Sequence, residues 1–145
     1  MALKRKNKVL ATDVVKNCRK LEIMTYELID KWKHKYKYTL IEAFRKHVEN
    51  LRESTICALR TNKIYVNEKI KFYDLSLCSL DNIEYLLEIM CSPYFNIISY
   101  NQYADFAMII DKVGEMVDRL MRSLTKTENN NNETPEFQNF DDERG

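Results

Sequence analysis

The sequence predicts an all-α protein folded as an antiparallel, up-down four-helix bundle. Three observations lead to this prediction. The 145 residues include only two glycines and two prolines, too few for the turns that a sheet protein needs. Four stretches of roughly 23 residues carry apolar side chains at alternating steps of three and four, the spacing of one helical face. Short links join these stretches, and such links favour neighbouring helices that run in opposite directions.

The chain divides into three predicted segments. Residues 1–11 read as a flexible basic arm, and residues 12–125 as the bundle, which forms one domain. Residues 126–145 contain the run Asn129–Asn132 and an acidic end, without a periodic apolar stripe. This composition is typical of disorder, so we expect a disordered tail after the bundle.

The first helix is expected from about Thr12, which can cap it, to His34. Its apolar stripe, which Tyr26 and Ile29 widen, consists of Val14, Cys18, Leu21, Thr25, Leu28 and Trp32. Residues 33–38 alternate basic and aromatic side chains. We interpret them as a link whose tyrosines cover the end of the core. The alternative is a nucleic-acid contact, in which lysine meets phosphate and tyrosine stacks on a base.

The second helix is expected from about Thr39 to Asn62, and Thr39 with Glu42 has the spacing of a capping box. Its core stripe is Leu40, Phe44, Val48, Leu51, Thr55 and Ala58, with Ile41 and Leu59 beside it. The third helix is expected from about Glu68 to Met90, and Pro93 prevents its continuation. Its apolar positions are Ile70, Tyr73, Leu77, Leu80, Ile83, Leu87 and Met90.

The fourth helix gives the clearest pattern, from Ser99 to Leu124. Its seam consists of Tyr103, Phe106, Ile110, Val113, Val117, Leu120 and Leu124. Ser99 and Gln102 have the spacing of a capping box, which marks the start of the helix. Gly114 lies inside the helix at a cost of roughly 1 kcal/mol relative to alanine. We therefore expect Gly114 to mark a point where another backbone approaches closely.

Side chains for catalysis or metal binding are missing from the places where a helical bundle needs them. Di-iron bundles place a glutamate three residues before a histidine, whereas Lys31 and Phe44 precede His34 and His47 at this spacing. Neither histidine has an arginine four to seven residues before it, as a helical ribonuclease would need. The four cysteines form no CxxC pair. We expect no enzyme activity, no metal and no cofactor.

The chain also lacks sequence signals for secretion and membrane insertion. No apolar run follows its basic N-terminus, as a secretory signal requires. No apolar run approaches the roughly 20 residues of a membrane span. We therefore expect a cytoplasmic protein with reduced, partly buried thiols.

The formal net charge of +1 hides a gradient along the chain. The first 63 residues carry +9, and residues 128–145 carry −5. Such asymmetry favours a polyanionic partner, and the alternative is an ordinary solvated surface. The residues that we expect to bind nucleic acid are Arg45, Lys46, Arg52, Arg60 and Lys63. Glu42, Glu49 and Glu53 are interspersed among them, which is the pattern of ordinary solubilising charge.

Several short stretches resemble a known family. Leu80-Asp81 with Leu86-Leu87, Ile98-Ser99 with Gln102-Tyr103, and Gly114 in an apolar heptad are similar to the last two helices of Avd. The entry Lys37-Tyr38-Thr39-Leu40 to a basic second helix is also similar. Avd is the accessory variability determinant of diversity-generating retroelements. The resemblance covers about residues 12–124, but this chain is less basic and adds an acidic tail.

The resemblance implies a four-helix bundle that assembles as a homopentamer with a basic surface. It implies binding of RNA or DNA with little sequence preference, and association with the retroelement reverse transcriptase during mutagenic copying of a template RNA. A sister group, the bundle protein encoded in intervening sequences of bacterial large-subunit rRNA genes, is also similar. The alternative function is therefore a structural interaction module of that type, without a nucleic-acid role.

Overall fold

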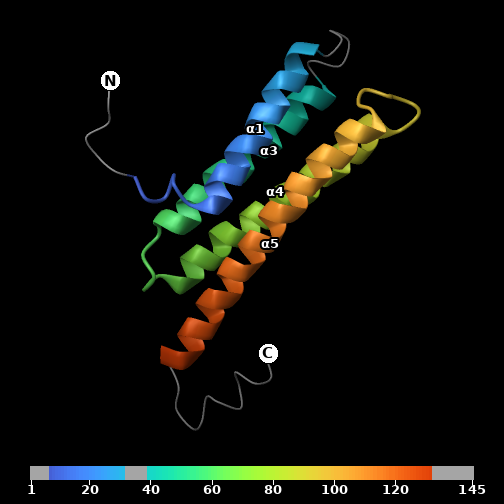
Figure 1. Cartoon of the computed structure of the whole chain (residues 1–145). Coiled ribbons are helices and arrows are strands. Elements are labelled where there is room, and N and C mark those ends of the chain that lie inside the picture. Colours follow the sequence, from blue (N-terminus) through green and yellow to red (C-terminus); the bar gives the residue numbers. More distant parts are fainter. Residues whose placement is uncertain (1–6, 32–38, 132–145) are drawn as a thin grey trace, which may run out of the picture.

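The structure, a computed structural model, describes residues 7–31 and 39–131, with side chains described as far as Thr125. Every regular element in these residues is an α-helix: α1 (Asp13–Lys31), α3 (Leu40–Arg60), α4 (Val66–Cys91) and α5 (Tyr100–Asn131). The helices lie lengthwise beside one another (Figure 1). The predicted all-α class with four helices is therefore confirmed for this part of the chain.

Each helix has two principal neighbours. The helix α1 packs against α3 and α5, and α4 packs against the same two helices from the other side. All four helices therefore surround one core. The C-terminal end of α5 projects beyond the other three helices (Figure 1).

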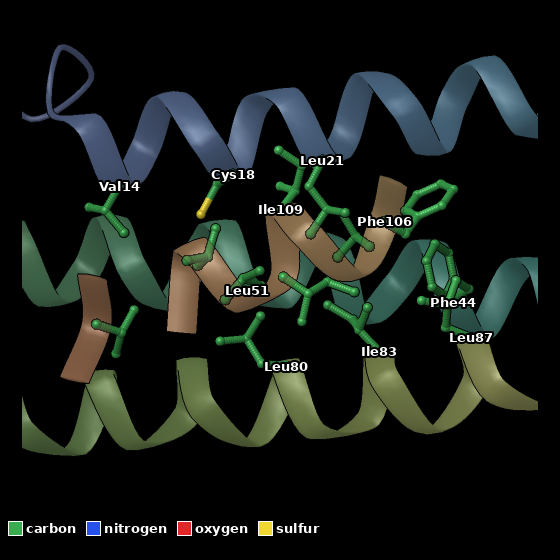
Figure 2. Close-up of a cluster of buried hydrophobic side chains, with 14 of the residues drawn as sticks. Val14, Cys18, Leu21, Phe44, Leu51, Leu80, Ile83, Leu87, Phe106 and Ile109 are labelled. Atoms are coloured by element: carbon green, nitrogen blue, oxygen red, sulfur yellow. The ribbon is translucent and has the colours of Figure 1, made fainter. Parts of the chain in front are cut away.

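The core is built from the apolar stripes that the helical spacing predicts. Figure 2 shows side chains from all four helices meeting between the ribbons. The fully buried side chains include Leu21, Phe44, Leu51, Tyr73, Ile83, Leu87, Ile110 and Val113. The rings of Phe44 and Phe106 meet edge to face, with centroids 5.6 Å apart and planes at 86°. This geometry places the positive ring edge against the negative ring face.

Two positions on α1 differ from the predicted stripe. Val15 is buried, whereas Tyr26 is 46% exposed. Tyr26 follows the buried Thr25 and therefore lies about 100° round the helix from it. The predicted stripe member Trp32 and the basic-aromatic residues 33–38 lie outside the described residues, as do Lys4, Arg5 and Lys6 of the predicted arm.

The start of α5 has the predicted capping box. The Ser99 backbone N–H donates to Oε1 of Gln102 at 2.8 Å, and the Gln102 backbone N–H donates to Oγ of Ser99 at 3.1 Å. The predicted box at the start of α3 was wrong. Thr39 makes no side-chain hydrogen bond that caps the helix, and the carboxylate of Glu42 pairs with Arg45 instead.

The helix α5 continues to Asn131, past residue 125 where the bundle was predicted to end. Extending an existing helix adds one hydrogen bond for each residue fixed, so it is easier than starting a new helix. Asparagines that would not begin a helix can therefore continue one. The rest of the predicted tail, residues 132–145, lies outside the described residues.

Gly114 does not mark a close approach of two backbones, so this prediction was wrong. A Cβ placed on Gly114 would meet Cδ1 of Leu80 at 3.8 Å, an ordinary van der Waals distance. The atom of α4 nearest to this position therefore belongs to the side chain of Leu80, not to the backbone. The glycine instead forms part of a shallow groove between α4 and α5.

Buried polar groups join α3 to α4. The hydroxyl of Ser76 lies 2.8 Å from that of Ser54 and 2.9 Å from that of Thr55. Nearer the link between the two helices, Lys69 donates from Nζ to the carbonyls of Ala58 and Thr61. These carbonyls belong to the end of α3, where a cation is favoured by the helix dipole. A lysine of α4 thus caps the preceding helix.

Candidate nucleic-acid interface

Four of the five residues predicted to bind nucleic acid lie on α3, on the sides that the core leaves open. The buried stripe of α3 includes Phe44, Val48 and Leu51, so the intervening positions face its flanks and solvent. The fifth residue, Lys63, lies in the link between α3 and α4. The structure divides these five residues into two groups with different electrostatic surroundings.

Arg45 belongs to the first group, whose charge is balanced locally. Its guanidinium pairs with Glu42 one turn before it and with Glu49 one turn after it, the latter at 2.7 Å. The hydrogen bond from Arg45 lowers the pKa of the Glu42 carboxyl, and the same bond raises the pKa of Arg45. Both groups are therefore charged at neutral pH, and their fields largely cancel at a distance.

Arg52 also belongs to this first group. Its Nε lies 2.7 Å from Oε1 of Glu22 on α1, and its Nη2 lies 3.9 Å from Glu49. The Nε has no hydrogen-bond partner among the described residues. The contact with Glu22 is therefore an ion pair without the geometry of a hydrogen bond. The pair bridges two helices, and Arg52 therefore holds α1 against α3 while contributing little free positive charge to the surface.

The second group consists of Lys46, Arg60 and Lys63, which are exposed. Within the described part of the chain, no carboxylate lies in ion-pair distance of any of them. Lys63 lies close enough to Lys69 to lower the pKa of that lysine, second to the effect of burial. Arg60 and Lys63 thus place uncompensated positive charge where α3 passes into α4.

The N-terminal residues 7–11 add to this second group, which the sequence did not predict. Asn7 accepts hydrogen bonds at Oδ1 from the Val9 backbone N–H at 3.1 Å and from Nη2 of Arg60 at 3.3 Å. These bonds hold the exposed Lys8 near Arg60. Part of the predicted flexible arm is therefore a turn fastened to α3. The signal was Asn7 itself, because asparagine accepts from the backbone two residues on.

We call Lys8, Arg60 and Lys63 the basic end of the molecule. Arg45 and Arg52 lie apart from it in mutual contact with Glu49, and Lys46 lies on the exposed side of α3. Phosphate binding needs cations that are not already paired, because each contact must release counterions from the nucleic acid. The basic end meets this requirement, whereas Arg45 and Arg52 would first have to give up their carboxylates.

The described residues contain no group of three or more His, Cys, Asp or Glu side chains placed to hold a metal ion. No helix in the described part of the chain is both long and apolar enough to cross a membrane. No protein-family model matches the sequence, and the search of curated proteins finds no similar sequence.

Proposed function

We propose that this protein is a non-catalytic accessory protein that binds RNA or DNA with little sequence preference. The observation that carries the proposal is the basic end, where Arg60 and Lys63 have no carboxylate partner among the described residues. Lysine and arginine at such a site contact phosphates, which every sequence offers alike. The resemblance to Avd supports a template RNA as the ligand and a retroelement reverse transcriptase as the protein partner in mutagenic retrohoming.

The proposal includes an antiparallel, up-down bundle. Contacts between neighbouring helices support it, because residue numbers fall on one helix as they rise on the next. Asn7, just before α1, contacts Arg60 at the end of α3. Glu22, further along α1, contacts Arg52, which comes before Arg60 on α3. Between α3 and α4, Ser76 contacts Ser54. Lys69 comes before Ser76 on α4, and it contacts Thr61, which comes after Ser54. In such a bundle the basic end contains the start of α1 and the link between α3 and α4.

The resemblance also supports assembly as a homopentamer, and the lack of secretory and membrane signals in the sequence supports a cytoplasmic location. A ring of five copies would present five basic ends to one nucleic acid. Linked sites bind with an effective concentration set by their spacing, so weak contacts at each copy become a tight combined interaction. Light scattering at micromolar concentration tests this assembly, and a monomeric mass would remove it from the proposal.

Binding is tested by replacing Arg60 and Lys63 with glutamate together. We expect this double variant to lose most of its affinity for a single-stranded template RNA at about 50 mM salt, because phosphate contacts dominate affinity at low salt. The matched control replaces Lys31 and Lys112 with glutamate, which changes the net charge equally on exposed residues elsewhere. Equal losses in both variants, or no binding by the wild type, would contradict the proposal.

A specific observation favours a second function, a protein-interaction module without nucleic acid. A groove of about 410 Å³ runs between α3 and α4, and its lining includes Cys57, Phe72, Leu75 and Cys78. Leu75 is 54% exposed there, and such a groove suits an apolar side chain of a partner. If the wild type binds no RNA, this structural-module function becomes the better explanation.

A further inference from the structure

A second surface of the molecule has the opposite character to the basic end. From Phe72 to Asp111 the sequence contains no lysine or arginine, whereas it contains six aspartates and glutamates. This stretch covers most of α4, its link to α5 and the first part of α5. A nucleic acid is repelled by such a surface, so a different class of partner must be considered there.

Large side chains are exposed on the same stretch. Tyr85 on α4 is 65% exposed, and on α5 Tyr100 is 78% and Met108 is 66% exposed. The Tyr100 ring stacks on that of Tyr103, with centroids 6.5 Å apart and planes at 22°. Tyrosine and methionine are enriched at protein interfaces. Stacking also restricts both rings, which lowers the entropy lost when a partner binds them.

Carboxylates from both helices lie near the Tyr103 ring, and Asp81 and Glu88 lie one helical turn either side of Tyr85. Burial raises the pKa of Glu84, and the nearby charges of Asp111, Asp81 and Glu88 raise it further. Glu88 and Glu84 likewise lie close enough to Tyr103 to raise the pKa of its hydroxyl, after the effect of burial. Asp81, Glu84 and Asp111 also line the groove of about 320 Å³ that contains Gly114. Within the described residues, no basic side chain is in ion-pair distance of these carboxylates.

We propose that this aromatic face, formed by Tyr85, Tyr100 and Tyr103 with the carboxylates of α4 and α5 beside them, binds an arginine-rich segment of a partner protein. A guanidinium stacks on an exposed tyrosine ring and can pair with a neighbouring carboxylate through the same planar group. The groove between α4 and α5, which Glu84 and Asp111 line, gives a guanidinium access to these carboxylates. The aromatic rings supply the contact area, and the charge selects a cationic partner.

This inference goes beyond the proposed function, because it requires no nucleic-acid binding. The two surfaces share no residue, so each can fail without the other. Arg60 and Lys63 belong to the basic end, whereas the aromatic face lies on α4 and α5. RNA binding measured on the variants below separates the two ideas, because those variants leave Arg60 and Lys63 in place.

The probe is a fluorescein-labelled ten-residue peptide of alternating arginine and alanine, titrated against the full chain and followed by fluorescence anisotropy. We expect the variant with Tyr85→Ala and Tyr100→Ala to bind about two- to fivefold more weakly for each ring, the effect of a cation–π contact at an exposed site. This variant leaves the charge unchanged. A peptide with lysine in place of arginine should bind the wild type more weakly, because lysine stacks poorly.

The electrostatic part is tested with Glu84→Gln and Asp111→Asn together, which should reduce affinity by up to about fivefold for each carboxylate, the effect of an exposed ion pair. The matched control is Glu27→Gln with Asp30→Asn on α1, which removes two exposed carboxylates elsewhere and should bind as the wild type does. Circular dichroism checks that each variant remains helical. Unchanged affinity in both face variants would overturn the proposal, since another acidic segment would then hold the peptide. A wild type that binds no peptide, but dissociates from an oligomer when Glu84 and Asp111 are changed, would overturn it in favour of a second copy of this chain.

Discussion

At the scale of single residues, burial decides the chemistry of the cysteines. Cys18 is buried in the core, whereas Cys57 and Cys78 are exposed beside the groove between α3 and α4. Burial raises the pKa of the Cys18 thiol to about 12, and Glu22 adds to this effect. The thiolate is the reactive form, so Cys18 should be inert in the native protein.

We therefore expect iodoacetamide at pH 8 to modify Cys57 and Cys78 in the native protein and to leave Cys18 unmodified. Peptide mass spectrometry after brief labelling measures this difference. All four cysteines should react in concentrated guanidinium chloride, which serves as the control. Native labelling of Cys18 at the rate of Cys57 would show that the core around α1 opens readily.

The arginines show at the same scale why a sequence pattern cannot fix a binding site. Arg45 pairs with glutamates one turn away on its own helix, which the spacing made foreseeable. Arg52 pairs with Glu22 on α1, and that contact depends on how two helices pack. The sequence therefore predicted which residues carry positive charge, but the packing of the helices determined which of these charges stay unpaired.

At the scale of elements, helix positions were predictable because the buried stripe is a local property of each segment. The seam of α5 at Phe106, Ile110, Val113 and Val117 is buried as the spacing predicted. Helix ends were less predictable, because several partners compete for the same groups. Glu42 had the spacing for a capping box with Thr39 but pairs with Arg45. Ser99 and Gln102 bond to each other, so that box formed.

The glycine inside α5 gives a prediction at this scale. Its position in the helix requires no glycine, since a Cβ there would only touch Leu80 at an ordinary distance. We expect Gly114→Ala to raise the free energy of unfolding by about 0.5–1 kcal/mol, through higher helix propensity and a less flexible unfolded chain. Urea denaturation followed by circular dichroism measures the change.

The control for this experiment is the reverse substitution at an exposed site of the same helix. Ala104→Gly should lower the free energy of unfolding by a similar amount, because Ala104 is exposed. A loss of stability in Gly114→Ala would contradict the structure of the groove between α4 and α5. It would mean that the site holds less space than the 3.8 Å distance to Leu80 provides.

At the scale of the whole molecule, packing turns a gradient along the chain into two different surfaces. The helices α1 and α3, which are neighbours, carry basic and acidic side chains in nearly equal number, so the unpaired positive charge gathers at the basic end. The stretch without lysine or arginine belongs to α4 and α5, which are also neighbours. Packing these two helices side by side keeps their negative charges together. This arrangement supports two partners of opposite charge, one at the basic end and one at the aromatic face.

The division of the basic residues into two groups leads to a prediction about salt. Removing one phosphate-binding cation should reduce the slope of log K against log salt by about 0.7 for a single strand. The double variant with Arg60→Gln and Lys63→Gln should therefore flatten the slope by about 1.4, with little change in stability because both side chains are exposed. The variant with Arg45→Gln and Arg52→Gln should keep most of the slope and lose stability, because Arg52 bridges to Glu22. RNA titrations from about 50 to 200 mM salt, with urea denaturation alongside, separate the two effects. Equal slopes for both variants would mean that the ion-paired arginines leave their carboxylates to bind phosphate.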